Sequence, residues 1–163
     1  MATVARRRKV RESFSQLPGH LIRRVHQVST AYFSEECGDL TAVQYAALVA
    51  IGAHPGIDAT RLSEIIYFDR STIGDVLDRM EGKGWILRES TPHDRRVKLL
   101  ALSPAGREVL QRVEPGIHRV QDRLLAGLTA AEGKTLIRLL AKMADATAGA
   151  AGAAGDDGDD GDD

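Results

Sequence analysis

The chain has 163 residues, 43% of them hydrophobic and 28% charged, which fits one globular domain and leaves too little length for two of ordinary size. Its single cysteine, Cys37, excludes an internal disulfide, and the uncharged stretch over residues 42–57 is too short to span a membrane, so we expect a cytoplasmic protein. The formal net charge of −1 hides an uneven distribution: residues 156–163 contain six aspartates, and without them the chain has 22 basic and 17 acidic residues, a net charge of +5. This excess of base favours a nucleic acid as partner, and nothing suggests a membrane partner.

The N-terminal region begins with a polar, basic segment, residues 1–12, that shows no apolar periodicity, and we expect a flexible arm there. From Phe14 to Tyr32, apolar residues recur at intervals of three and four, which predicts a helix with one apolar face. Gly38 is expected to end this helix.

A second helix is predicted over residues 42–53, because Thr41 and Gln44 have the spacing of a capping box. This segment is apolar on nearly all sides, so we expect the helix to be buried. Residues 13–57 therefore form a region of N-terminal dimerisation helices and a lead-in helix.

Two short helices separated by a tight turn are predicted next. Asp58 can cap a helix over residues 59–66. After the turn, either Asp69 or Ser71 can cap another helix that runs to about Lys83.

The periodicity then changes to that of strands. Residues 85–89 and 97–102 are predicted to pair as a β-hairpin around a polar, basic tip at residues 91–96. Residues 58–102 thus have the order helix, turn, helix and hairpin, which is that of a winged helix-turn-helix DNA-binding lobe.

The C-terminal region, residues 103–147, is predicted to hold two further dimerisation helices. Pro115 lies inside the apolar pattern of the first and predicts a kink, at a cost of roughly 3 kcal/mol unless packing compensates. Thr129 and Glu132 form a second capping box that begins the last helix. Residues 148–163 are alanine, glycine and aspartate, and we expect a disordered acidic tail there.

The predicted fold is mainly α-helical with a small β-hairpin wing, a winged helix-turn-helix flanked by long dimerisation helices. One short domain cannot bury apolar faces of this length at both of its ends. We therefore expect the faces to pack on a second copy of the chain, in a homodimer.

The helix that follows Asp69 is the best candidate for reading a DNA sequence. A helix fits the major groove, where arginine binds guanine at two atoms and serine or threonine binds phosphates or bases. Taken alone, an amphipathic helix with two arginines is more often a solvated surface helix; the hairpin beside it is what favours DNA. Gly74 costs about 1 kcal/mol relative to alanine, and it allows either close approach of the backbone to DNA or a packed neighbour. The candidate contacts on this helix are Arg70, Ser71, Thr72, Asp75 and Arg79.

The hairpin supplies the remaining candidate DNA contacts, which are Arg95, Arg96 and Lys98. An arginine at such a tip can enter the minor groove, where the negative potential is concentrated, and Asp94 can orient it. The alternative is a polar turn with a surface ion pair, which contributes little.

Five motifs within residues 40–106 carry a resemblance to a known family: Asp69-Arg70-Ser71-Thr72, Leu77-Asp78-Arg79-Met80, Lys83-Gly84-Trp85, Asp94-Arg95-Arg96 and Leu102-Ser103-Pro104-Ala105-Gly106. This run resembles the MarR family of bacterial transcription regulators. The resemblance implies a homodimer that binds a roughly palindromic operator, usually as a repressor that a small phenolic or aromatic acid releases. Residues 17–27 resemble regulators of aromatic-acid catabolism, among them a repressor of nicotinic-acid degradation that senses 6-hydroxynicotinate.

The resemblance also implies an effector site between the dimerisation helices and the DNA-binding lobe. A cation or imidazole facing an apolar crevice can pair with a carboxylate, and tyrosine or threonine can bind a ring substituent. The alternative is that the arginines are solvated and that the histidines are ordinary core residues. The candidate ligand-binding residues are His20, Arg23, Arg24, His26, Tyr45, Asp69 and Thr72.

Three other functional classes fit the sequence less well. A redox-switched DNA-binding regulator would use Cys37 as a thiolate near cations, but Glu35, Glu36 and Asp39 surround it in sequence, which favours an inert thiol. A winged-helix module that binds only proteins does not explain the basic tip. An enzyme is the least supported class, because no nucleophile and base, phosphate loop or metal-ligand cluster is present, and we expect no metal or cofactor.

Overall fold

The computed structural model describes residues 14–90 and 98–153. The predicted arm, the hairpin tip with Asp94, Arg95 and Arg96, and the aspartates of residues 156–163 lie outside the described residues. The chain divides into two compact units, Met1–Arg123 and Leu124–Asp163. The described part is mainly α-helical with one two-stranded sheet, as predicted.

Helix α2 spans Pro18–Cys37. The sequence predicted a single helix from Phe14, and this was wrong: Leu17 is extended, with φ −68° and ψ 128°, and α2 begins at the following proline. The reason is that proline lacks an N–H and restricts the residue before it to extended conformations. Gly38 ends the helix with a φ of 61°, as predicted.

Helix α3, Ala42–Ala53, begins with the predicted capping box: Thr41 Oγ1 accepts from Gln44 N at 3.2 Å, and Gln44 Oε1 accepts from Thr41 N at 3.1 Å. Leu48 and Ile51 are completely buried at the centre of the hydrophobic core. The helix is not buried on every side, because Val49 remains 45% exposed.

Helices α4, Ala59–Ile66, and α5, Arg70–Gly82, form the predicted helix-turn-helix. The Asp58 carboxylate caps α4 by accepting from Arg61 N at 2.9 Å. Asp69 caps α5, which decides between the two candidate caps. The inner side of α5 is buried as predicted, through Ile73, Leu77 and Met80.

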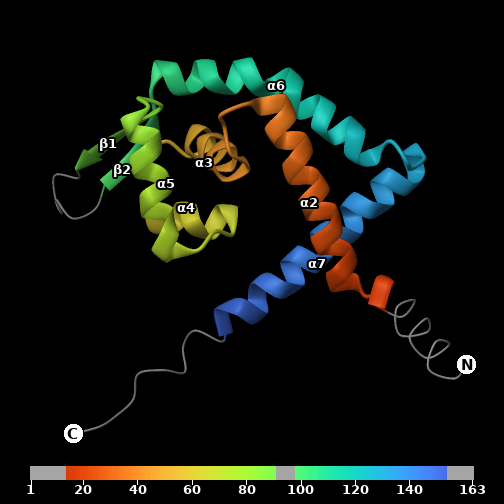
Figure 1. Cartoon of the computed structure of the whole chain (residues 1–163). Helices are drawn as coiled ribbons and strands as arrows, with labels where there is room; N and C mark the ends of the chain where they lie inside the picture. Colours follow the sequence, from red (N-terminus) through yellow and green to blue (C-terminus); the bar gives the residue numbers. More distant parts are fainter. Residues whose placement is uncertain (1–13, 91–97, 154–163) are drawn as a thin grey trace, which may run out of the picture. The chain divides into compact units, whose positions relative to one another are not determined.

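Strands β1, Ile86–Ser90, and β2, Lys98–Leu102, pair antiparallel, with Ile86 opposite Leu102 and Ser90 opposite Lys98. Ile57 adds a single bridge to Leu100 on the other side of β2, so the segment before α4 is tied to the hairpin. Figure 1 shows the hairpin lying beside α5.

Helix α6 spans Pro104–Leu125 and is preceded by Ser103. The Ser103 hydroxyl accepts from Gly106 N at 3.0 Å and donates to Gly84 O at 2.6 Å. The helix continues unbroken past Pro115, and its axis changes direction along its length (Figure 1). Val109, Val113 and Val120 are buried along it.

Helix α7 spans Ala130–Ala153 and begins with the predicted capping box of Thr129 and Glu132. The tail was predicted to begin at residue 148, whereas the helix runs to Ala153. Alanine has the highest intrinsic helix propensity, so an alanine-rich segment can continue a helix without burying apolar surface. No helix in the described residues is both long and apolar enough to cross a membrane.

Candidate nucleic-acid interface

Helix α5 has one anchored side and one solvent-exposed side. Its buried residues recur at intervals of three and four and hold it against α4 and the hairpin. The DNA contacts predicted on α5 all lie on its exposed side, which carries Arg70, Ser71, Thr72, Asp75 and Arg79. Among the described residues, no carboxylate forms an ion pair with Arg70 or Arg79, so both guanidinium groups can turn to a ligand.

The start of α5 is ordered by its cap. The Asp69 carboxylate accepts from the Ser71 amide at 2.7 Å and from the Ser71 hydroxyl, and the Thr72 hydroxyl donates to Asp69 O at 3.2 Å. The hydrogen bonds from Ser71 hold the pKa of the Asp69 carboxyl below its ordinary value. The two hydroxyl groups therefore already donate to the cap, and they offer oxygen acceptors to a base edge unless they rotate.

Gly74 lies on the exposed side of α5. A Cβ built there would meet no atom within 4 Å, so no packed neighbour in the described part of the chain accounts for the glycine. Of the two explanations that the sequence left open, the packed neighbour is wrong for the described residues, and close approach of a ligand remains.

The described strands of the hairpin carry two cations with different partners. Lys98 is exposed, and its Nζ donates to Ser90 Oγ across the two strands at 2.6 Å. Arg88, in β1, donates from Nη2 to Asp78 Oδ1 of α5 at 2.6 Å, and its Nε lies 3.3 Å from Glu81 Oε2. Sequence reasoning missed the contact of Arg88 with α5; the only signal was that Asp78 and Glu81 share one face of the helix.

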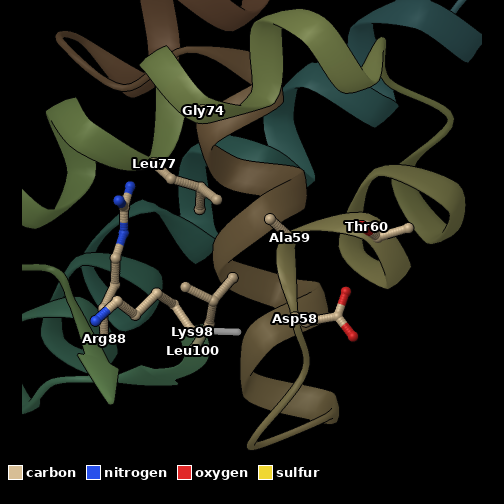
Figure 2. A pocket seen from close by; sticks show the side chains of 8 residues that line it. All are labelled: Asp58, Ala59, Thr60, Gly74, Leu77, Arg88, Lys98 and Leu100. Atoms are coloured by element: carbon tan, nitrogen blue, oxygen red, sulfur yellow. The ribbon is translucent and has the colours of Figure 1, made fainter. Parts of the chain in front are cut away.

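A cavity of about 370 Å³ lies between the helix-turn-helix and the hairpin. Figure 2 shows Leu77 and Gly74 on its α5 side and the long side chains of Arg88 and Lys98 on its hairpin side. The guanidinium of Arg88 extends along the cavity towards α5. The full lining is Asp58, Ala59, Thr60, Gly74, Leu77, Arg88, Lys98 and Leu100.

Comparison with known proteins identifies the family to which this chain belongs. A family model described as MarR family matches residues 40–98. The transcriptional regulator HosA of Escherichia coli O111:H- is 33% identical over 127 residues, which are 78% of this chain and 94% of HosA. The chain belongs to the MarR family.

Solved structures of MarR-family regulators share the fold. The PcaV transcriptional regulator from Streptomyces coelicolor, in complex with its natural ligand, is 34% identical with a TM-score of 0.77, over 82% of this chain and 95% of PcaV. Bordetella bronchiseptica BpsR, in a structure concerning regulation of its DNA binding by 6-hydroxynicotinic acid, is 29% identical with a TM-score of 0.74, over 77% of this chain and 97% of BpsR. The protein is thus a MarR-family transcriptional regulator with a winged-helix fold, and not an enzyme.

The effector residues expected for a MarR-family protein are not brought together within one chain. His20, Arg23, Arg24 and His26 lie on the first half of α2, where the His20 ring packs on Phe14 with centroids 4.4 Å apart. Tyr45 instead packs on Phe33, near the other end of α2, with centroids 6.0 Å apart. At 1.5 Å per residue, His20 and Phe33 are about 20 Å apart along the helix.

The other two candidate effector residues, Asp69 and Thr72, lie at the start of α5. Among the described residues, no hydrogen bond or ion pair joins either of them to α2. The described residues also contain no group of three or more histidine, cysteine or acidic side chains that could hold a metal ion.

Cys37 lies in the core at the end of α2, with 8% of its surface exposed. Burial raises the pKa of its thiol, and the neighbouring Glu36 carboxylate raises that pKa further. Arg119 of α6 pairs with the Glu36 carboxylate at 2.7 Å, so its positive charge is directed to Glu36 and not to the Cys37 thiol. A protonated, buried thiol is a poor redox sensor, so the surroundings of Cys37 disfavour the redox alternative.

Proposed function

We propose that the protein is a homodimeric, sequence-specific DNA-binding repressor that a small aromatic acid, such as a hydroxylated nicotinate or benzoate, releases from a pseudo-palindromic operator. Action on chromosomal DNA would place it in the cytoplasm. The observation that carries the proposal is the geometry of α5: an apolar side fixed in the core and a polar side with two available arginines, next to a hairpin.

DNA recognition follows from this geometry. The N-terminal half of α5 would enter the major groove, where Arg70 can bind a guanine at two atoms. The hairpin would follow the adjacent backbone or minor groove through Lys98 and, in the part outside the described residues, Arg95 and Arg96.

The homodimer is supported by apolar surface that the single chain leaves exposed. On α2, Leu21, Val25 and Val28 are between 40% and 58% exposed, and they lie on one face. On α7, Leu136, Leu139, Leu140 and Met143 are between 37% and 47% exposed, again on one face. Apolar stripes of this length are typical of an interface between subunits.

The effector is supported by the 6-hydroxynicotinic acid named for BpsR, by the ligand-bound structure of PcaV and by the basic side of α2. At 100° per residue, Arg24 and His20 lie beside the apolar stripe of α2, so a subunit that covers the stripe would enclose them in an apolar crevice. Such a crevice strengthens the pairing of a guanidinium with a carboxylate. The candidate residues that one chain keeps apart would then require the second copy to complete the site.

The cavity beside α5 is less suited to an anionic effector. Its Arg88 is already paired with two carboxylates, and Asp58 also lines it. Together with Lys98, these groups have a net charge of −1, which disfavours a further carboxylate.

Release from DNA requires the effector to prefer a dimer whose two α5 helices are wrongly spaced for successive major grooves. Shifting nearly all of the population requires a preference of about 5.5 kcal/mol for that state.

DNA binding is tested by anisotropy titration of labelled fragments from the region upstream of the protein's own gene, with random DNA of equal length as control. We expect specific binding that weakens steeply with salt, because phosphate neutralisation releases counterions. Arg70→Ala should weaken binding to the specific fragment by about 1–3 kcal/mol and leave random DNA little affected. Equal affinity for both DNAs at every salt concentration would contradict the proposal.

The effector is tested by thermal shift with hydroxylated benzoates and pyridine carboxylates. A true effector stabilises the protein in proportion to RT ln(1 + [L]/Kd), and it lowers the affinity for the specific fragment. Arg24→Ala should remove the ligand-induced shift and keep DNA binding, whereas Arg112→Ala, an exposed arginine of α6, serves as the matched control. A ligand-induced thermal shift that persists in Arg24→Ala would show that the effector binds away from Arg24.

A further inference from the structure

Arg88 joins the two elements that are proposed to contact DNA. It projects from β1, and its guanidinium is shared between two carboxylates of α5, Asp78 at 2.6 Å and Glu81 at 3.3 Å. The Arg88 side chain is only 22% exposed, whereas those of Asp78 and Glu81 are 67% and 47% exposed. The Arg88 side chain thus extends from β1 to α5, and the two carboxylates lie on the surface of α5.

This pairing removes Arg88 from the cations that can bind phosphate. A guanidinium paired with two carboxylates would have to give up both of them to contact DNA, and it would leave two negative charges next to a polyanion. The three groups together have a net charge of −1. A net negative cluster does not help electrostatic attraction to DNA, so Arg88 must contribute in another way.

The packing of the hairpin indicates how Arg88 contributes to DNA binding. At its base, the hairpin is fixed by buried Ile86 and by the hydrogen bond from Ser103 N to Trp85 O at 3.1 Å. Farther out, the hydrogen bonds of Leu100 with Gly56 and Ile57 tie β2 to the segment before α4, and a cavity of about 370 Å³ lies between the hairpin and the two helices α4 and α5, so the packing of the strands on α5 is incomplete there. Arg88 spans this cavity (Figure 2) and provides a direct polar link from β1 to the helix.

We propose that Arg88 is a positioning residue that sets the distance and angle of the β1–β2 hairpin relative to α5, so that both elements fit one DNA duplex at the same time. This inference rests on the proposed DNA binding by α5 and the hairpin. Arg88 itself makes no contact with the DNA.

The decisive variant is Asp78→Asn combined with Glu81→Gln, because charge and geometry then predict opposite results. The double substitution removes two negative charges from the reading helix, so a purely electrostatic role predicts tighter DNA binding. Loss of the positioning contacts predicts binding of the specific fragment that is roughly three- to tenfold weaker, on the scale of a partly buried ion pair. The side chains of Asp78 and Glu81 are 67% and 47% exposed, so the variant is expected to fold, and thermal denaturation checks this.

Glu64→Gln is the matched control. Glu64 forms an exposed ion pair with Arg61 within α4, at 2.8 Å, so the control removes a carboxylate and an ion pair from the same lobe without touching the hairpin. Its affinity for the specific fragment should stay the same or increase. Arg88→Lys keeps the charge but not the forked geometry, and it should retain more affinity than Arg88→Met.

Footprinting separates positioning from general damage. In Asp78→Asn/Glu81→Gln, protection of guanine N7 from methylation, which reports the major groove, should persist at saturating protein. Protection of the flanking backbone from hydroxyl radicals, which reports the hairpin, should be lost. Tighter binding by this variant, or equal loss of both protections, would overturn the inference. If the unmodified protein itself binds no specific fragment, the proposed function fails instead.

Discussion

Tyr67 is the one described residue other than glycine with a positive φ, at 50°. It ends α4 in the left-handed region, where Cβ approaches the following carbonyl and costs roughly 1–2 kcal/mol. Its side chain is 71% exposed, so packing returns little of this energy. Nothing in the sequence marked the position, because turns of this kind are usually recognised by a glycine or asparagine.

The first prediction is that Tyr67→Asn raises the free energy of unfolding by roughly 0.5–1 kcal/mol, since asparagine tolerates the left-handed region better. Denaturant titration at neutral pH measures this. Tyr67→Phe keeps the backbone cost and removes only the hydroxyl, so its stability should match that of the unmodified protein. Destabilisation by asparagine would show that the exposed ring makes a contact that the strain argument ignores.

Gly74 gives the second prediction. Alanine fits there without a contact inside 4 Å and has better helix propensity, so Gly74→Ala should stabilise the protein by roughly 0.5–1 kcal/mol. The new methyl group would project into the cavity between α5 and the hairpin that Gly74 lines, so affinity for the specific fragment should fall while stability rises if DNA approaches the backbone there. Gly82→Ala, at the end of the same helix and also without a contact inside 4 Å, should not lower the affinity. Unchanged binding by Gly74→Ala would exclude close approach of DNA.

At the scale of elements, α2 is joined to α6 by a set of ion pairs. Glu36 accepts from Arg119 at 2.7 Å and from Arg123 at 3.2 Å, and Arg123 also reaches Glu35 at 2.7 Å and lies over the Tyr32 ring. The helices approach closely, because a Cβ at Gly116 would lie 2.7 Å from Glu36 O. The end of α2 is therefore fixed on α6 by both charge and shape.

The third prediction concerns acid. The hydrogen bond from Arg119 lowers the pKa of Glu36 below its ordinary value of 4.5. A carboxyl with a lowered folded-state pKa stabilises the fold above its unfolded pKa, and this contribution is lost as the pH falls through the folded value. Glu36→Gln should therefore be less stable than the unmodified protein at pH 7, with the difference shrinking below about pH 4.5.

Thermal unfolding of both proteins from pH 7 to pH 3 checks this. Other carboxyls, such as Asp69 and Glu132, also have lowered pKa values, so both proteins lose stability in acid and only their difference reports Glu36. Glu108→Gln, an exposed position on α6, controls for the loss of a charge. A difference that stays constant across this range would rule out a protonation effect at Glu36.

Local and long-range features differed in how well the sequence predicted them. The capping boxes at Thr41 and Thr129 and the cap at Asp58 depend on residues three positions apart, and all were confirmed. The contact of Arg88 with Asp78 and the cavity beside it depend on how a strand is placed on a helix, which no local pattern encodes. The effector residues were predicted from the site that the family resemblance implies, and the structure packs Tyr45 of α3 on Phe33, which lies far along α2 from His20.

The single chain leaves two apolar stripes exposed, one on α2 and one on α7. The sequence predicted both stripes, because each recurs with a helical period. It could not predict which surface covers them, since that depends on the assembly and not on the helix. Dimerisation thus stays a proposal, and it has a direct test on α7.

The fourth prediction is that Leu140→Glu abolishes dimerisation. Leu140 is 47% exposed in the single chain, so a monomeric protein would tolerate glutamate there with a change within about 0.5 kcal/mol. In a dimer, the same change buries an unpaired charge at the interface, which costs several kcal/mol. Sedimentation should show a monomer, and affinity for the specific fragment should collapse because one reading helix cannot span two half-sites. Arg138→Glu, on the opposite face of α7 at 100° per residue, should leave both properties intact. A Leu140→Glu protein that remains a dimer would mean that α7 does not form the interface.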